Sequence, residues 1–344
     1  MSVFSLTIRL VFLTFANNMM HVNLKTAVGR PTFFLATEEY LAQNVKSDTD
    51  YLLIWETEPA VIFGRNQLID NEVNIQFCKE HGVGMYRRKS GGGCVYSDTG
   101  NLMLSLVTAD REVGFAFNRY VMLVALLLSK LGVEAQVSGR NDVLVDGKKV
   151  SGNAFYRTAN GSIAHGTLLY DTDIERMTNC LTPSHEKLAS HGVASVRSRI
   201  ALLKDYTSLT LEQVKAKIPT LLCQDEMTLS EKDYAAISEI EQSYLTDEFI
   251  FGKNPAFDVN CKGRIDGVGT IELRLQVKNG EIRRANMLGD FFLLGDLDRL
   301  LTSLIGATLD AESLTAALPD DVGEIIKGLE KPMLVEFIIK TIKP

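Results

Sequence analysis

The chain has 344 residues, of which 46% are hydrophobic and 23% charged, a composition typical of a soluble globular protein with room for one large and one smaller domain. Its formal net charge is −7 and its basic residues form no long runs, so nucleic acid is not expected as a bulk partner. The five cysteines include no C-x-x-C spacing, which argues against a zinc ribbon or a disulfide framework and favours reduced thiols in the cytoplasm.

The N-terminal segment contains an apolar run over residues 10–16 that follows Arg9. The run is too short to span a bilayer, and no good small-x-small cleavage site follows it. We therefore expect neither export nor a membrane partner. Our hypothesis is that residues 1–19 are an over-extended start or a disordered tail, and that the folded domain begins at residue 20.

The spacing of apolar residues predicts most elements of the first half of the chain. We expect helices over 33–45, 75–80 and 115–131, and strands over 51–55, 60–63, 83–87, 102–108, 133–137 and 161–170. The helix over 115–131 has the strongest pattern and ends at Gly132, a residue type that often stops helices. His165 is a polar residue within the last of these strands, and a histidine in that setting is more often a hydrogen-bonded core residue than a catalyst.

Three consecutive glycines, Gly91 to Gly93, follow the cations of residues 87–89 and lie between two predicted strands. Glycine loses more backbone entropy on folding than other residues, so such a run needs a reason, which is commonly close approach of the backbone to a ligand. A loop of inward-pointing N–H groups next to cations suits phosphate. A sharp turn without a ligand is the alternative for this segment alone.

Asp146-Gly147 between β-branched runs predicts a two-residue hairpin turn. The predicted pairs are Val145 with Lys148, Leu144 with Lys149, Val143 with Val150, and Asp142 with Ser151. This register places Asp142, Leu144, Lys149 and Ser151 on one sheet face, with Asp142 and Lys149 within reach of each other or of a shared ion. An exposed hairpin with a surface lysine pair is the alternative.

The C-terminal part of the chain predicts a small α+β domain. Asn279-Gly280 indicates a hairpin between strands over 269–278 and 281–288. Helices are expected over 296–305, 311–317 and 320–329, with Pro319 and Pro332 as breaks.

Five motifs occur in order along the chain: RRKSGGGCVYSDTGN (87–101), SGRNDVLVDGKKVSGNAFY (138–156), HGTLLYD (165–171), ASVRSRI (194–200) and FGKNPAF (251–257). Together they closely resemble the lipoate-protein ligase A family over residues 20–257. The resemblance implies an α+β fold: a large mixed-sheet catalytic domain of the biotin/lipoate ligase type over 20–257, and a small C-terminal α+β accessory domain over 258–344.

The resemblance also implies a function. Members of this family activate free lipoate with ATP, in the presence of Mg²⁺, to bound lipoyl-AMP. They then transfer the lipoyl group to a lysine of lipoyl domains, such as E2 subunits of 2-oxoacid dehydrogenases or the glycine cleavage H protein. We expect a cytoplasmic enzyme, favour a monomer, and leave the preference between lipoate and octanoate open.

Family roles carried onto matching positions give a set of candidate site residues. Lys149 is implied as the catalytic lysine and Asp142 as a contact of Mg²⁺. The implied ATP and lipoyl-AMP contacts are Arg88, Gly93, Cys94, Val95, Tyr96, Asn141, Asp142 and Lys149, and the implied lipoate contacts are Ser90, Gly91, Gly92, His165 and Gly166. Val95, Val150 and Leu168 are candidates for the apolar tunnel. Cys94 departs from the family pattern, because many relatives have alanine there.

The sequence leaves three alternatives to the ligase function. An octanoyltransferase of the same superfamily would use a nucleophilic cysteine, for which Cys180 or Cys94 would be the nominee, but its cysteine-centred motifs are not evident. A biotin ligase shares the fold, yet its G-R-G-R-x-G-R pattern is absent. A binding module that holds lipoyl or nucleotide without turnover is the third.

Overall fold

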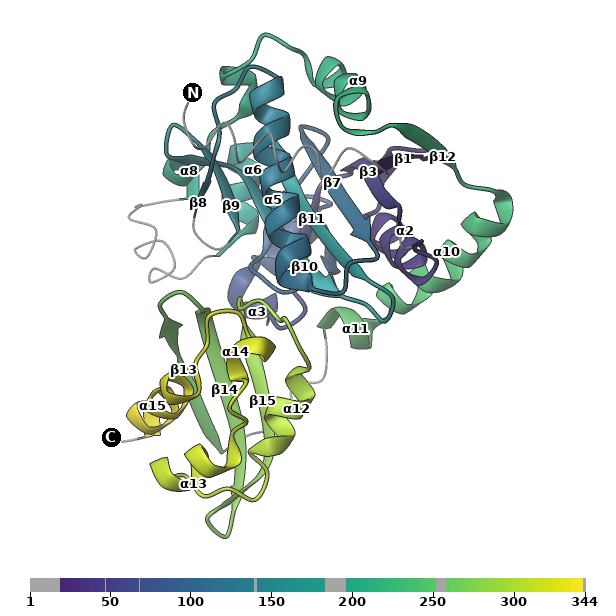
Figure 1. Ribbon diagram of the computed structural model, residues 1–344. Coiled ribbons are helices and arrows are strands. Elements are labelled where there is room, and N and C mark those ends of the chain that lie inside the picture. The colour runs from purple at the N-terminus through teal and green to yellow at the C-terminus, as the bar shows by residue number, and fades with distance from the viewer. Residues whose placement is uncertain are drawn as a thin grey trace, which may run out of the picture.

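The computed structural model describes residues 19–46, 48–67, 69–138, 141–182, 196–251 and 258–342. A large domain built on a mixed sheet lies beside a smaller C-terminal domain, drawn in green and yellow in Figure 1. The proposed N-terminal extension, except its last residue, and most of the FGKNPAF motif lie outside the described residues.

The central sheet of the large domain has the strand order β12-β1-β3-β7-β11-β10-β9-β8, with β2 pairing beside β3. Its strands are β1 (Met19–Asn23), β2 (Val28–Gly29), β3 (Asp50–Thr57), β7 (Asn101–Thr108), β8 (Gln136–Ser138), β9 (Asp142–Val145), β10 (Lys148–Arg157), β11 (Ser162–Leu169) and β12 (Asp225–Thr228). β1 runs parallel to β3 and β12, and β2 runs parallel to β3. From β3 onward, each strand in the order β3-β7-β11-β10-β9-β8 is antiparallel to the next. The predicted large mixed sheet is confirmed.

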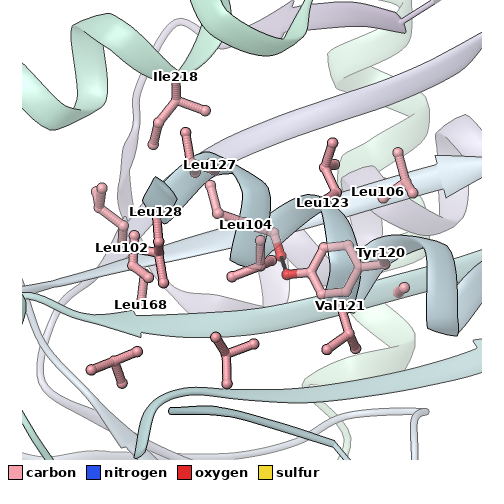
Figure 2. Close-up of a cluster of buried hydrophobic side chains, with 14 of the residues drawn as sticks. Leu102, Leu104, Leu106, Tyr120, Val121, Leu123, Leu127, Leu128, Leu168 and Ile218 are labelled. Carbon is pink, nitrogen blue, oxygen red and sulfur yellow. Dashed lines mark hydrogen bonds between the residues drawn. The ribbon is translucent and has the colours of Figure 1, made fainter. Parts of the chain in front are cut away.

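Successive side chains of β3 point to opposite faces of this sheet, and both faces are buried. Leu52 and Ile54 join the core under helices α5 (Val113–Lys130) and α9 (Leu211–Leu222). Tyr51, Leu53 and Trp55 point to the other face, which α2 (Pro31–Gln43) and α10 (Glu231–Tyr244) cover. Figure 2 shows the first of these cores, where leucines of β7 meet the apolar stripe of α5. The strongest predicted helix is thus confirmed as the element that buries one side of the sheet.

A small three-stranded sheet holds the glycine loop. It consists of β4 (Ala60–Phe63), β5 (Gly84–Arg87) and β6 (Val95–Ser97), with β4 in the middle. Helices α3 (Ile69–Glu72), α4 (Ile75–Glu80) and α6 (Ile174–Cys180) are associated with it. β5 precedes the glycine loop and β6 follows it, and the two strands pair with opposite edges of β4. The loop is therefore fixed at both ends.

The C-terminal domain packs helices on an antiparallel sheet of β13 (Val259–Ile265), β14 (Gly269–Lys278) and β15 (Glu281–Gly289). Asn279 and Gly280 have φ values of 57° and 82°, as the predicted two-residue turn requires. The helices of this domain are α12 (Leu297–Ser303), α13 (Ala311–Ala317), α14 (Val322–Ile325) and α15 (Lys331–Ile342). The described part of the large domain also contains the short helices α8 (Val196–Arg199), η1 (Leu203–Asp205) and α11 (Asp247–Phe251).

Two predictions for this domain are wrong. The helix expected over 320–329 covers only Val322–Ile325. Pro332 is not a break, because it lies in the first turn of α15. Proline is tolerated there, since the N–H that it lacks has no partner within the helix at that position.

The segment after β15 joins the two domains. The Gly92 N–H donates to the Phe291 carbonyl at 3.2 Å, which connects the glycine loop to the C-terminal domain. The Phe292 ring is 1% exposed and stacks on Phe155 of the large domain, with ring centroids 5.3 Å apart. Lys327 lies over Phe117, with its Nζ 4.9 Å from the ring centroid. The C-terminal domain therefore completes the core of the large domain beside the glycine loop.

Replacing Phe292 with alanine should destabilise this junction. Loss of a fully buried phenylalanine is expected to lower the free energy of unfolding by about 3 kcal/mol. Denaturant unfolding of the full chain measures this loss. Phe251→Ala is the control, because Phe251 is 43% exposed and its loss should cost no more than about 0.5 kcal/mol. Equal stability of the two variants would contradict the packing described.

Candidate active site

A pocket lies across the strands of the central sheet, on the side of α2. Its apolar wall is made by Leu35, Trp55, Ile62 and Met103, and its polar wall includes Asn141, Lys149, Asn153 and Arg199. Trp55 and Met103 belong to β3 and β7, whereas Lys149 and Asn153 belong to β10, and β11 lies between β7 and β10. The strand order thus separates an apolar end from a cationic end.

The hairpin that carries Lys149 differs from its predicted register at one point. Asp146 and Gly147 have φ values of 50° and 73°, and the predicted pairs of Val145 with Lys148 and Leu144 with Lys149 are present. The register then shifts between Lys149 and Ser151, a β-bulge. As a result Val143 pairs with Ser151, and Asp142 pairs with Gly152. The predicted pairs of Val143 with Val150 and of Asp142 with Ser151 are therefore wrong. Ser151 does not share a sheet face with Asp142.

Lys149, Asp142 and Arg199 form an ion triad at the polar end of the pocket. Lys149 Nζ lies 2.8 Å from Asp142 Oδ1, and Arg199 Nη2 lies 2.7 Å from Asp142 Oδ2. Burial would raise the pKa of the Asp142 carboxyl, but Lys149 and Arg199 outweigh it and hold that pKa below its ordinary value. Two cations share one carboxylate, so the triad keeps a formal charge of +1 for an anionic ligand.

Gly152 makes room for the ammonium of Lys149. A Cβ atom at position 152 would lie 2.3 Å from Lys149 Nζ and 2.5 Å from its Cε. Any larger residue would therefore push the lysine out of this position. The glycine of the K-V-S-G motif thus has a direct physical role in placing its lysine.

Arg88 is buried beneath the glycine loop and holds its shape. Its guanidinium donates to the carbonyls of Ile62 at 2.8 Å and of Gly91 and Gly93 at 2.7 Å. Burial lowers its pKa to about 10, which still leaves the side chain charged at neutral pH. The glycine loop is therefore held in shape by hydrogen bonds from the charged guanidinium of Arg88 to its carbonyls.

The structure brings most of the predicted site residues to the pocket but not all of them. Those that line it are Arg88, Gly92, Gly93, Cys94, Val95, Asn141, Lys149, His165 and Gly166. Ser90, Gly91 and Tyr96 are buried or packed behind the lining, and Asp142 is joined to it through Lys149. Two tunnel candidates, Val150 and Leu168, are wrong, because they lie in the core under α5.

Sequence reasoning missed several pocket residues. Arg199 lies in the quoted ASVRSRI motif, so a signal existed, but its basic cluster resembled an ordinary solvated turn. Leu35 and Met103 looked like core residues of a helix and a strand. Asp290 and Phe292 line the pocket from the C-terminal domain and carry no local signal.

Of the two cysteines nominated for the octanoyltransferase alternative, Cys94 lines the pocket, whereas Cys180 is unsuited to attack. Cys180 is fully buried, and burial raises the pKa of its thiol to about 12. Within the described ranges, no group of three or more His, Cys, Asp or Glu side chains could hold a metal ion.

Family comparisons agree with this fold and site. Residues 30–222 match the family model of the lipoyl protein ligase A/B catalytic domain, and residues 254–338 match that of the bacterial lipoate protein ligase C-terminus. The lipoate-protein ligase LplJ of Bacillus subtilis is 36% identical over 81% of this chain and 87% of its own. Lipoate–protein ligase 1 of Staphylococcus aureus is 34% identical over 84% and 90% of the two chains.

Solved structures share the fold. P. falciparum LipL1, in complex with lipoate, aligns with a TM-score of 0.72 at 19% identity and covers 94% of this chain and 100% of its own. The bi-partite lipoate protein ligase of Thermoplasma acidophilum, studied with its E2 lipoyl domain, aligns with a TM-score of 0.61 at 26% identity over 71% of this chain and 100% of its own. The first of these likenesses covers nearly the whole chain.

Fold and site together define a ligase with a mixed-sheet catalytic domain and a small accessory domain. The chain belongs to the lipoyl protein ligase A/B family, and it is a lipoate-protein ligase.

Gly152→Ala tests the placement of Lys149. The added methyl group should displace the ammonium, and misplacement of a catalytic group by about 1 Å can lower a rate about a hundredfold. Ligase activity measures the effect. The control is Gly114→Ala, because a Cβ atom at that position meets only Glu112 Oε1 at 3.5 Å. Full activity of the Gly152 variant would mean that the position of Lys149 is unimportant.

Asp142→Asn tests the ion triad through pH. A lowered carboxyl pKa gives stability that is present above the unfolded value of about 3.9 and is lost as pH falls through the lower folded value. The asparagine variant should therefore lose stability at neutral pH and show a flatter decline below about pH 4. Denaturant unfolding across this range measures both effects. An unchanged acid slope would show that Asp142 is not the titrating group.

Proposed function

We propose that the chain catalyses two half-reactions in this one pocket, with ATP as the activating substrate. The single observation that carries the proposal is the Lys149–Asp142–Arg199 triad at the polar end of an otherwise apolar pocket. An acyl chain suits the wall of Leu35, Trp55 and Met103, and a carboxylate or phosphate suits the cationic end. Lipoate combines these two chemistries in one molecule.

In the first half-reaction, a carboxylate oxygen of lipoate attacks the α-phosphorus of ATP. The bond to the bridging oxygen breaks, pyrophosphate leaves, and lipoyl-AMP forms. Negative charge accumulates on the α-phosphate oxygens during this displacement, and Lys149 and Arg199 are placed to stabilise it without moving far. Lys149 acts here as a cation and not as a nucleophile.

In the second half-reaction, the amine of an acceptor lysine attacks the lipoyl carbonyl carbon. An amide bond forms, the amine loses a proton, and AMP leaves. Departure of AMP is eased because its phosphate is already neutralised by the same cations. Gly93, Cys94 and Val95 are assigned to the nucleotide side of the pocket, and Gly92, His165 and Gly166 to the acyl side.

Mg²⁺ is proposed to arrive with the nucleotide. Both carboxylate oxygens of Asp142 already contact cations, so this residue fits a metal only by exchanging Lys149 or Arg199 for it. Mg²⁺ commonly binds through substrate phosphates and one or two carboxylates, and it would neutralise phosphate charge. The roles given to Lys149 and Arg199 require no protein-only metal site.

The acceptors are proposed to be lipoyl domains, either E2 subunits or the glycine cleavage H protein, and the enzyme a cytoplasmic monomer. The described cysteines are free, which suits a reducing compartment. Among the helices in the described part of the chain, none has the length and apolar character needed to cross a bilayer. The large exposed apolar side chains found there are scattered along the chain: Val28, Phe115, Val137, Phe251 and Ile305.

Lys149→Ala should abolish most adenylate formation while the fold remains. Loss of one preorganised charge donor typically lowers a rate by about a hundredfold to a thousandfold. Lipoyl-AMP and pyrophosphate are measured without acceptor, and the lipoylated lysine is measured with a lipoyl domain. Lys148→Ala is the matched control, because Lys148 is exposed and precedes Lys149 in the same strand.

Two results would contradict the proposal. Unchanged adenylate formation by the Lys149 variant would remove its assigned role. Transfer of octanoyl from a carrier protein, with no adenylate formed by the unmodified chain, would make the protein a transferase.

A further inference from the structure

A buried chain of hydrogen bonds runs behind the pocket wall and meets at Glu38 on α2. Glu38 is fully buried and does not line the pocket. Its Oε1 accepts from Ser105 at 2.5 Å, and its Oε2 lies 2.8 Å from His165 Nδ1. Beyond these two partners the chain continues to Trp55 on one side and to Ser90 on the other.

Donor-only groups stand at both ends of this series of hydrogen bonds. The Trp55 indole can only donate, and it donates to Ser105 Oγ at 2.8 Å, so the Ser105 hydroxyl proton points to Glu38. The Arg88 guanidinium can also only donate, and its Nε donates to Ser90 Oγ at 3.0 Å. Ser90 Oγ lies 2.7 Å from His165 Nε2, and it donates to that nitrogen when the nitrogen carries no proton.

An acceptor role for Glu38 implies one tautomer of His165. In this tautomer the ring proton is on Nδ1 and is donated to Glu38, and Nε2 accepts from Ser90. Both sides of this series of hydrogen bonds then donate toward the single side chain of Glu38. The histidine that resembled an ordinary core residue in the sequence is one link in this chain.

Three members of the chain line the pocket: Trp55 at the apolar end, His165 beside it, and Arg88 under the glycine loop. We propose that Glu38 is the positioning residue that fixes these three side chains relative to one another. The shape of the acyl pocket and the shape of the adenylating loop are thereby set together. This inference rests on the proposed function. It adds a specificity role for a residue that never touches substrate.

Glu38→Gln breaks the pattern with almost no change in shape. The glutamine amide must donate where the carboxylate accepted, so either Ser105 or His165 has to reverse its hydrogen bond. Reversal at His165 moves its proton to Nε2, and reversal at Ser105 alters the partner of the Trp55 indole. We expect kcat/KM for lipoate to fall roughly tenfold, as for other residues that orient a functional histidine, with the KM for ATP changed less than about twofold.

Nuclear magnetic resonance provides a readout that a purely structural role would not alter. Trp55 is the one tryptophan of the chain, so its indole N–H gives a unique signal, and His165 is one of five histidines. The unmodified protein should show a protonated Nδ1 at His165, identified by its absence from His165→Asn. In Glu38→Gln the Trp55 indole signal or the His165 ring nitrogens should shift.

Glu241→Gln is the matched control, because Glu241 is a buried carboxylate on α10 that accepts from Thr32 and belongs to a different network. It should leave both signals and the kinetic constants unchanged. Glu38→Asp keeps an acceptor at the position, should retain the Nδ1 proton, and replaces the glutamine variant if that one does not fold.

A proton on His165 Nε2 in the unmodified protein would overturn the inference. Equal kinetics and signals in the Glu38 and Glu241 variants would also overturn it. Absence of lipoyl-AMP in the unmodified protein is a different result, which would instead remove the proposed function.

Discussion

The structure depends on one electrostatic arrangement, in which two cations share a single buried carboxylate at the end of an apolar pocket. Burying Asp142 alone would be unfavourable, and the cations Lys149 and Arg199 offset that cost. The pair of cations is in turn held in place by the carboxylate until an anionic ligand reaches them. This balance explains why a chain with a net charge of −7 can present a local positive site.

Several local features serve that arrangement. The bulge after Lys149 and the bare backbone of Gly152 let the ammonium reach Asp142. The bulge is flanked by a bridge between Lys149 and Ile200, and the Ala201 N–H donates to the Lys149 carbonyl at 2.9 Å. The segment that carries Arg199 therefore also fixes the strand that carries Lys149. One local geometry thus supports all three charges.

The glycine loop has two different reasons for its glycines. A Cβ atom at position 91 would lie 2.5 Å from the Phe291 carbonyl oxygen, and Gly92 has a φ of 83° with the Phe292 ring beside it. Both positions are glycine because the C-terminal domain approaches them closely. Gly92 has a second reason, since a positive φ favours glycine. The sequence argument that assigned the glycines to a ligand was therefore incomplete, because it considered the loop without the second domain.

Local patterns predicted the elements whose causes are local. The helix α5 and the turns at Asp146-Gly147 and Asn279-Gly280 follow from apolar spacing and from residues that accept positive φ. The bulge at Val150 could not be predicted in this way, because Ile200, which bridges the neighbouring Lys149, is distant in the sequence. The same holds for the apolar wall, whose residues come from separate strands and a helix, and for Phe292, which comes from the other domain.

The most direct test of this account is an experimental structure with a non-hydrolysable analogue of lipoyl-AMP bound to the full chain. The account predicts that the phosphate linkage lies within about 3 Å of Lys149 Nζ and that the acyl chain runs toward Leu35, Trp55 and Met103. An analogue bound with its acyl chain outside this wall, or with Lys149 making no contact to it, would contradict the account.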